Sequence, residues 1–236
     1  MIEQAITLAN GQRIAYLLEY RTRRTVGLKI TQQGLVVHAP KRIVSHQLQQ
    51  ILLEKSAWIT SKLALREANA VEKIQWQHGE HLLLLGQDIE LQLLPTSAKQ
   101  TLRLDGQQLI LTVKDSADTV AIAKRVVRWY QQQAYEDFVR RVAIFAAKLG
   151  VPAPPVALSN AQSRWGSCNS RGQIRLSWRL IQAPPQIINH VVCHELAHLK
   201  EMNHSPKFYA VLATLFPEYT TAEQALKRLS PQLHRI

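Results

Sequence analysis

The chain has 236 residues, 46% of them hydrophobic, and its 29 lysines and arginines against 17 aspartates and glutamates give a net charge of +12. Such a chain can bury the core of one large domain or two modest ones. Its longest apolar runs, such as Leu82–Leu85, exclude a bilayer-spanning protein, and two cysteines, Cys168 and Cys193, exclude a disulfide framework.

The same features predict the compartment and the partners. The first residues, Met1–Gln4, lack the basic start and apolar core of a signal peptide, so we expect a cytoplasmic protein with buried free thiols and no membrane contact. A pI near 10.0 favours polyanionic partners, such as nucleic acid or nucleotides, although a basic surface can also serve solubility alone. The sequence does not indicate an oligomeric state.

The first half of the chain alternates between strand and helix patterns. Residues 13–38 alternate apolar and polar side chains, with a turn at Gly34. From Ser45 apolar residues recur at three- and four-residue steps, which predicts a helix, and residues 81–113 return to strand patterning with a turn signal at Gly86. We interpret residues 1–115 as an N-terminal β-rich region, a small antiparallel sheet with one helix across it.

The second half begins with a long helix from about Ser116, which Gly150 ends. A hairpin follows, with residues 163–168 and 173–180 as its strands. Further on, Thr220 and Glu223 have the spacing of a capping box for a last short helix. We assign residues 116–236 to a second domain.

Residues 194–198 read His-Glu-Leu-Ala-His, and on a helix the two histidines lie one turn apart on the same face. Both imidazoles can then reach one metal ion, whereas Glu195 is rotated by about 100° and is placed to deprotonate a water. The same short pattern also occurs among ordinary surface or core histidines. Here Pro184-Pro185 begin a helix upstream, and this context favours a metal site.

A third ligand is offered by His204, since a catalytic zinc takes three protein ligands and keeps one open position. Asn203 tolerates the left-handed conformation that ends helices, and Ser205-Pro206 directly afterwards begin a new helix. The chain is thus predicted to leave the first helix at Asn203 and to turn His204 back toward it. We expect one zinc ion per chain, with nickel or cobalt as substitutes, on His194, His198 and His204.

This order of long helix, hairpin, histidine helix, turn and third ligand resembles the zincin metallopeptidases. More narrowly, three segments look like the YgjP-like metallopeptidase family, which is related to the SprT-like peptidases: Arg164-Trp165-Gly166-Ser167-Cys168, His194–His198 and His204-Ser205-Pro206-Lys207-Phe208. The segments around Arg21, Arg23, Arg24 and Trp58 resemble the leading region of that family.

The resemblance implies an α+β fold, in which an N-terminal antiparallel sheet with a helix precedes a zincin-like, minimal metallopeptidase domain of helices and a β-hairpin. It also implies a zinc-binding hydrolase whose general base is Glu195 and whose ligands are His194, His198 and His204.

Other ligand sets fit the sequence less well. Position 201, where the metzincins carry glycine, is Glu201, and no Met-turn is recognisable, so metzincin membership is excluded. A third ligand of the gluzincin type, Glu218 or Glu223 on a later helix, is less favoured than His204, because His204 lies closer to the motif along the chain. His190 lies one turn before the motif and is interpreted as a helix-flanking histidine.

Four side chains are candidates for substrate binding: Arg164, Arg175, Arg179 and Tyr209. Arg175 and Arg179 share one face of the hairpin's second strand, near the expected cleft. Arg164, Arg175 or Tyr209 is a candidate to stabilise an oxyanion, with ion pairing or packing beside Phe208 as the structural alternatives. The hairpin also offers an edge strand to an extended peptide.

The sequence therefore predicts a zinc-dependent metallohydrolase, in the first place a metallopeptidase with Glu195 as base. The alternative is a nucleotide pyrophosphatase, because the same centre can attack a phosphoanhydride and some members of the resembled family carry a UTP pyrophosphatase label. Against it, a three-histidine site favours zinc, nickel or cobalt over magnesium, and no Walker-type glycine loop is visible. A nucleic-acid-associated module with structural zinc is the second alternative, which an open fourth position disfavours.

Overall fold

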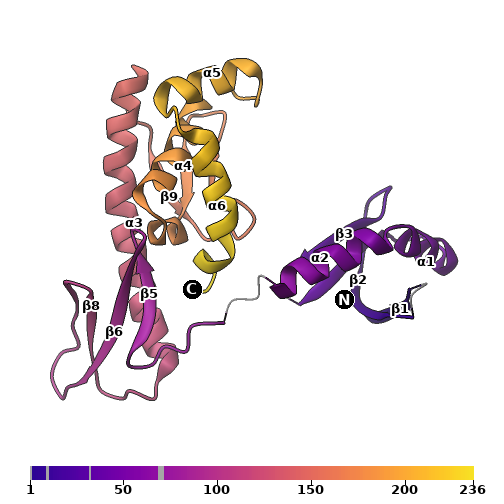
Figure 1. The fold of residues 1–236 in the computed structure, drawn as a ribbon, viewed down its shortest axis with the longest axis horizontal. Coiled ribbons are helices and arrows are strands. Elements are labelled where there is room, and N and C mark those ends of the chain that lie inside the picture. Colours follow the sequence, from indigo (N-terminus) through magenta and orange to yellow (C-terminus); the bar gives the residue numbers. More distant parts are fainter. Residues whose placement is uncertain (1, 9–10, 32, 69–71) are drawn as a thin grey trace. The chain divides into compact units, whose positions relative to one another are not determined.

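The structure is a computed structural model and describes residues 2–8, 11–31, 33–68 and 72–236. The chain forms two compact units, residues 1–70 and 71–236, each with its own hydrophobic core. Sheets and helices occur in both units, which confirms the predicted α+β class (Figure 1). Within the described ranges, no helix has the length and apolar character of a membrane span.

One four-stranded sheet and two helices make up the N-terminal unit. The strand order is β1-β2-β4-β3, so the second strands of two hairpins lie side by side and run in the same direction. The sheet is therefore antiparallel at both outer pairs and parallel at its centre. The predicted single helix is interrupted at Lys55 and forms two helices. The elements are β1 (Ile2–Thr7), β2 (Arg13–Arg21), β3 (Gly27–Thr31), β4 (Gly34–Pro40), α1 (Ser45–Glu54) and α2 (Ser56–Ala68).

A second four-stranded sheet repeats this topology, with the order β5-β6-β8-β7 and a parallel central pair. The connections before β2 and β6 differ in length, but each contains a glycine with a φ of 79°, Gly11 and Gly86. A positive φ of this size favours glycine. The strands are β5 (Glu80–Leu84), β6 (Gln87–Pro95), β7 (Leu102–Asp105) and β8 (Gln108–Val113).

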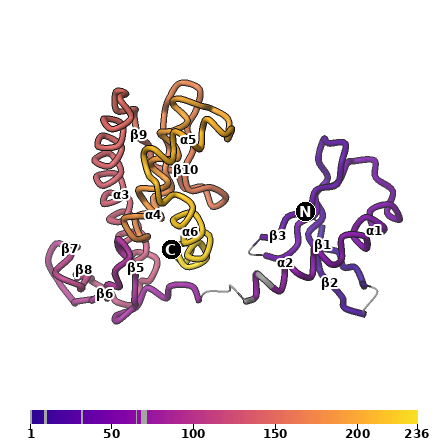
Figure 2. The backbone as a smooth tube through the Cα atoms, turned by 45° about the horizontal axis from the view of Figure 1, so that its top comes forward, coloured from indigo at the N-terminus to yellow at the C-terminus, as the bar shows by residue number. Residues whose placement is uncertain are grey.

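Helix α3 (Thr119–Leu149) joins this sheet to the rest of the second unit, as the tube in Figure 2 shows. Asp118 caps its start, because its carboxylate accepts a hydrogen bond from the backbone N–H of Ala121. Buried residues recur along the helix from Ile122 to Ala146, and Gly150, with a φ of 68°, ends it as expected.

The second sheet shares its hydrophobic core with α3, so the compact units divide near residue 70 rather than at the expected boundary of 115. The hydroxyl of Tyr130 on α3 donates to the carbonyl of Leu83, at 2.9 Å. The turn after β5 is held by two further backbone bonds, from Leu85 to Ile181 and from Gly86 to Gln182, of 2.8 and 2.9 Å. Residues 80–113 therefore pack with the helical part of the chain.

The predicted hairpin is present, and a third strand extends it. In the order β10-β11-β9, strand β10 lies at the edge and β11 runs parallel to β9. The second strand ends at Ser177, and the chain continues as a 3-10 helix, so Arg179 does not share a strand face with Arg175. The elements are β9 (Val156–Ser159), β10 (Gly166–Cys168), β11 (Ile174–Ser177) and η1 (Trp178–Gln182).

Three helices complete the second unit: α4 (Pro185–Ala197), α5 (Pro206–Leu215) and α6 (Tyr219–Leu233). Ser205 caps α5, since its hydroxyl accepts from the N–H of Phe208, and Pro206 occupies the first turn as predicted. The capping box expected at Thr220 and Glu223 does not form, because α6 begins at Tyr219 without a side-chain cap.

Candidate metal centre and active site

Helix α4 and the turn after it bring His194, His198 and His204 together. Their ring centroids are 4.8 to 5.1 Å apart, and one nitrogen from each ring lies within 4.8 Å of the others. The Nε2 atoms of His194 and His204 are 3.0 Å apart. Two nitrogens bound to one tetrahedral zinc at about 2.0–2.1 Å lie about 3.3 Å apart, so these two converge at a suitable spacing.

The route to His204 differs from the expected one. Helix α4 ends at Ala197, and His198 is its C-cap in a right-handed conformation. Asn203 is absent from the non-glycine residues with positive φ among the described residues, so the exit expected there is wrong. The turn begins five residues earlier, where the N–H groups of Lys200 and Glu201 both bond to the carbonyl of Ala197.

The pKa values of His194 and His198 favour neutral imidazoles, which can bind a divalent cation. Burial, together with the neighbouring histidines, lowers the pKa of His194 to about 4, and burial also lowers that of His198. Neutral rings have a free nitrogen lone pair for a metal. His198 Nδ1 lies 3.2 Å from the carbonyl oxygen of Glu201, which can only accept, so Nδ1 carries the proton and Nε2 is left for the ion.

Phe208 packs against all three histidines, a role that was not predicted from the sequence. Its buried ring lies 4.7 to 5.0 Å, between centroids, from each of the three imidazoles. The signal in the sequence was its position three residues after the cap of α5, which places it on the inner face of that helix. An aromatic wall excludes water from one side of the histidines and limits their rotamers.

Glu195 is only 5% exposed, and its Oε2 has no hydrogen-bond partner among the described residues. Burial raises the pKa of Glu195 to about 8, while the charge of Arg164 acts in the opposite direction. A buried carboxylate oxygen without a hydrogen bond costs free energy, and a polar molecule bound beside it would relieve that cost. Glu195 is therefore placed to exchange a proton with a molecule at the histidine cluster.

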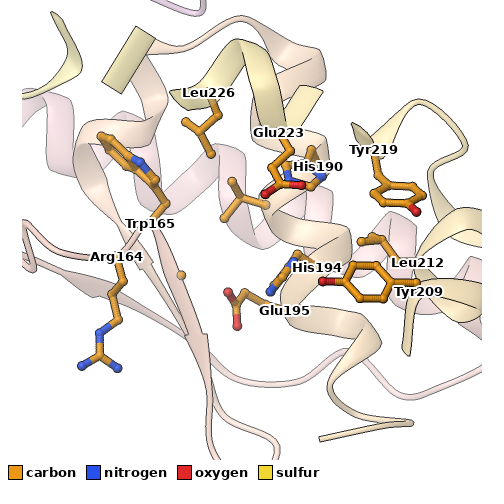
Figure 3. Close-up of a pocket in the computed structure, with 12 residues that line it drawn as sticks. Arg164, Trp165, His190, His194, Glu195, Tyr209, Leu212, Tyr219, Glu223 and Leu226 are labelled. Carbon is orange, nitrogen blue, oxygen red and sulfur yellow. The ribbon is translucent and has the colours of Figure 1, made fainter. Parts of the chain in front are cut away.

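A cavity of about 240 Å³ opens beside His194 and Glu195 (Figure 3). Aromatic and aliphatic residues make up half of the residues that line it: Trp165, Val191, Tyr209, Leu212, Tyr219 and Leu226. His190 and Glu223 are its other ionisable residues, apart from Arg164 at its edge. The sequence analysis had not assigned Trp165, Val191 or Leu226 to a site, because their proximity depends on how α4, α6 and the hairpin pack.

Two of the four predicted substrate-binding residues line this cavity. Arg164 is exposed, and the ring of Tyr209, which is 41% exposed, has its hydroxyl directed toward His194 (Figure 3). Arg175 is exposed on β11 and is not among the lining residues. Arg179 is 8% exposed, and its guanidinium donates to the carbonyl of Ile236 and to Asn160 Oδ1, at 2.6 and 2.7 Å. The expectation of Arg179 at the cleft is wrong, because η1 turns it toward the end of α6.

The residues with less favoured roles also have clear positions. His190 is 4% exposed, one turn before His194, with its Nδ1 lacking a hydrogen-bond partner among the described residues. Glu218 precedes α6 at the surface, and Glu223 pairs with Lys227. Neither carboxylate belongs to the histidine cluster. Cys168 and Cys193 are free thiols, and burial raises the pKa of Cys193 to about 12.

Comparisons with known proteins give one family model and two similar proteins. The family model described as YgjP-like, metallopeptidase domain, matches residues 24–229. A UTP pyrophosphatase of Escherichia coli (strain K12) is 30% identical over 101 residues, which are 40% of this chain and 60% of that protein. The crystal structure of the metallopeptidase zymogen of Pyrococcus abyssi abylysin is similar over 42% of this chain and 95% of that chain, with 25% identity and a TM-score of 0.34.

Proposed function

This chain belongs to the YgjP-like family of metallopeptidase domains, and on that premise we propose that it cleaves peptide bonds with a zinc ion and a glutamate base. Family membership makes it a metallohydrolase with a divalent metal. In the proposal, His194, His198 and His204 hold one zinc ion per chain, for which three neutral imidazoles are suitable donors and for which nickel or cobalt could substitute. Glu195 is the general base.

The observation that carries the proposal is the position of Glu195. Its carboxylate is buried in the wall of the cavity, its Oε2 has no hydrogen-bond partner among the described residues, and the residue directly follows His194 on α4. A structural zinc site is closed by four protein ligands and needs no such carboxylate, whereas a hydrolytic site needs both an open position and a base. The arrangement therefore supports catalysis over a structural zinc in a nucleic-acid-associated module.

Bound zinc would supply a Lewis acid that makes a water acidic near neutral pH. Glu195 then accepts the proton of that water and later donates it to the amine of the leaving peptide. Its pKa, raised by burial, brings the carboxyl closer to the pH at which both transfers occur. Tyr209 and Arg164 are the two lining donors for the developing negative charge, and the edge strand β10 offers backbone groups to an extended peptide.

The test compares Glu195→Gln with the wild type in metal content and in cleavage of an unfolded protein. The amide keeps the shape of the carboxylate and cannot accept the proton, so we expect unchanged metal occupancy and a rate lower by about 10²–10⁴. Glu218→Gln, at the surface before α6, is the matched control and should cleave like the wild type. Full turnover by metal-loaded Glu195→Gln would overturn the assignment of the base.

UTP pyrophosphatase is the second candidate, favoured by the name of the Escherichia coli relative. The chain spans only about 60% of the length of that protein, and the similarity is 30% over 101 residues. The exposed cation of Arg164 beside the cavity would suit a phosphate group. Release of pyrophosphate from UTP should be measured in parallel. If UTP is hydrolysed in a metal- and Glu195-dependent reaction and no peptide is cleaved, the pyrophosphatase replaces the peptidase.

A further inference from the structure

The cavity beside Glu195 combines apolar walls with a carboxylate, and this combination indicates what it binds. Val191, Leu212 and Leu226 supply aliphatic surface, and the rings of Tyr209 and Tyr219 stack with centroids 6.0 Å apart. Glu223 reaches in from α6, beside His190 and on the same side as His194 (Figure 3). We call this cavity the Glu223 pocket. Its complement is a side chain with a long apolar stem and a polar, positively charged end.

Glu223 keeps its negative charge in the pocket. Lys227 Nζ lies 2.8 Å from Glu223 Oε1, and this hydrogen bond lowers the pKa of Glu223 below its ordinary value. The lysine side chain is 72% exposed, so the ion pair is a solvated surface pair that contributes little free energy. A ligand can share the carboxylate through Oε2, or displace Lys227, at small cost.

Arg164 is the only lysine or arginine among the described residues that line the pocket. His190 lies beside Glu223, and burial lowers the pKa of His190 while the charge of Glu223 acts in the opposite direction. The guanidinium of Arg164 lies at the far edge of the pocket, beyond Glu195, and points away from Glu223 (Figure 3). The electron-rich faces of Tyr209 and Tyr219 add a further attraction for a cation.

We propose that the Glu223 pocket selects a lysine or arginine side chain next to the scissile bond, a proposal that rests on the peptidase function proposed above. The stem of the side chain packs on the aliphatic wall while its cationic end pairs with Glu223. Because His194 and Glu195 line the same cavity, a side chain held there positions its own peptide group at the histidine cluster. Glu223 is thus a specificity residue, and it takes no part in the proton transfers.

The first experiment measures cleavage of peptides that differ at one position by the metal-loaded full chain. Lysine, methionine and glutamate are placed in turn on each side of the scissile bond, and kcat/KM is obtained for each peptide. We expect the wild type to favour lysine over methionine by about tenfold, the size of one charge-assisted hydrogen bond. In Glu223→Gln the ratio should fall toward one, and in Glu223→Lys the glutamate peptide should become the preferred one. Glu218→Gln removes an equal charge outside the pocket and should keep the lysine preference.

A second experiment separates this proposal from the peptidase function. Lysine hydroxamate and norleucine hydroxamate differ only in the terminal amine, and their binding to metal-loaded wild type and Glu223→Gln is measured by calorimetry. Tighter binding of lysine hydroxamate that is lost in Glu223→Gln supports the pocket even if no peptide is cleaved. If peptides are cleaved and the ratio of kcat/KM for lysine over methionine is the same in the wild type and in Glu223→Gln, the proposed role of the pocket is refuted and the peptidase function stands.

Discussion

Glu195 occupies its buried position because residue 166 opposite it has no side chain. A Cβ built on Gly166 would lie 2.4 Å from Glu195 Oε1 and 2.7 Å from Cγ, both far inside contact distance. The φ of Gly166 is not in the left-handed region, so the backbone itself does not require glycine there. The requirement comes from the carboxylate that packs on β10. Gly166 is accordingly a positioning residue for the proposed base.

Gly166→Ala should therefore impair hydrolysis without removing the metal. The added methyl group must displace the Glu195 side chain, and a displacement of about 1 Å can cost about 10²-fold in rate. We expect a loss of that size in kcat, with unchanged metal stoichiometry by elemental analysis. Ser167→Ala, the next residue on the same strand, is the control. Wild-type kcat in Gly166→Ala would show that Glu195 tolerates the shift or is not the base.

His204→Ala tests the third ligand. Two imidazoles on α4 would remain, and loss of one of three ligands should reduce metal occupancy sharply after dialysis against a weak chelator. His190→Gln alters the nearest other histidine on α4 and should retain the metal, since His190 is outside the cluster. Retained metal in His204→Ala would exclude His204 from the ligand set, and a matching loss in His190→Gln would include His190 in it.

At the level of elements, hydrogen bonds join η1 to the C-terminal end of α6 and the residues after it. Arg179 and Gln182 on η1 donate to the carbonyls of Ile236 and Leu233. His234 stacks on Trp165, a wall of the Glu223 pocket, with ring centroids 4.6 Å apart. The C-terminal segment therefore supports the wall that faces the substrate.

Arg179→Ala should lower stability more than a surface substitution does. It removes the hydrogen bonds to the carbonyl of Ile236 and to Asn160 Oδ1, which keeps a bond from Trp178 Nε1, and it removes the contact with the ring of Trp178. A cost of about 2–3 kcal/mol is expected, or a Tm lower by roughly 4–12 °C for a unit of this size. Arg175→Ala, which changes the exposed side chain on β11, should change Tm little. Equal melting curves for the two variants would contradict a stabilising role for the bonds between Arg179 and the C-terminal segment.

The elements show why some features were predictable from the sequence and others were not. His194, His198 and Glu195 lie within one stretch of helix, whose periodicity alone places them. The prediction for Arg179 was wrong because apolar and polar residues continue to alternate in the sequence where strand β11 ends and the 3-10 helix η1 begins. Glu195 meets Gly166 only through packing between segments 29 positions apart, and such contacts depend on tertiary structure that no local pattern encodes.

Across the whole molecule, the expected boundary at residue 115 failed for the same reason. Strand patterning identifies residues 81–113 as a sheet but does not indicate which helices cover it. The core that includes Leu91, Leu109 and Tyr130 joins that sheet to α3. The N-terminal unit keeps a separate core and a concave surface with two arginines, Arg24 and Arg42, at its rim.

We expect this charge to produce salt-sensitive binding of polyanions by the full chain. If the +12 charge recruits a nucleic acid or a nucleotide, log K should fall linearly with log salt while metal occupancy stays constant. Titrations of single-stranded DNA, duplex DNA and UTP between low and physiological salt would measure it. The double variant Arg24→Ala, Arg42→Ala should bind more weakly than Lys124→Ala, Arg125→Ala, which removes equal charge from α3. No binding of any ligand at low salt would assign the charge to solubility.

The repeated sheet topology has a consequence for how the two copies can change. Gly11 and Gly86 share a φ of 79°, yet a Cβ at Gly11 would meet nothing within 4 Å, whereas one at Gly86 would lie 2.8 Å from Pro184. Asparagine tolerates a positive φ, so Gly11→Asn is expected to be nearly neutral and Gly86→Asn to be damaging. The turn at Gly11 is therefore open to mutational drift and to insertion of a label or a binding loop. The contact with Pro184 excludes both at the turn that contains Gly86.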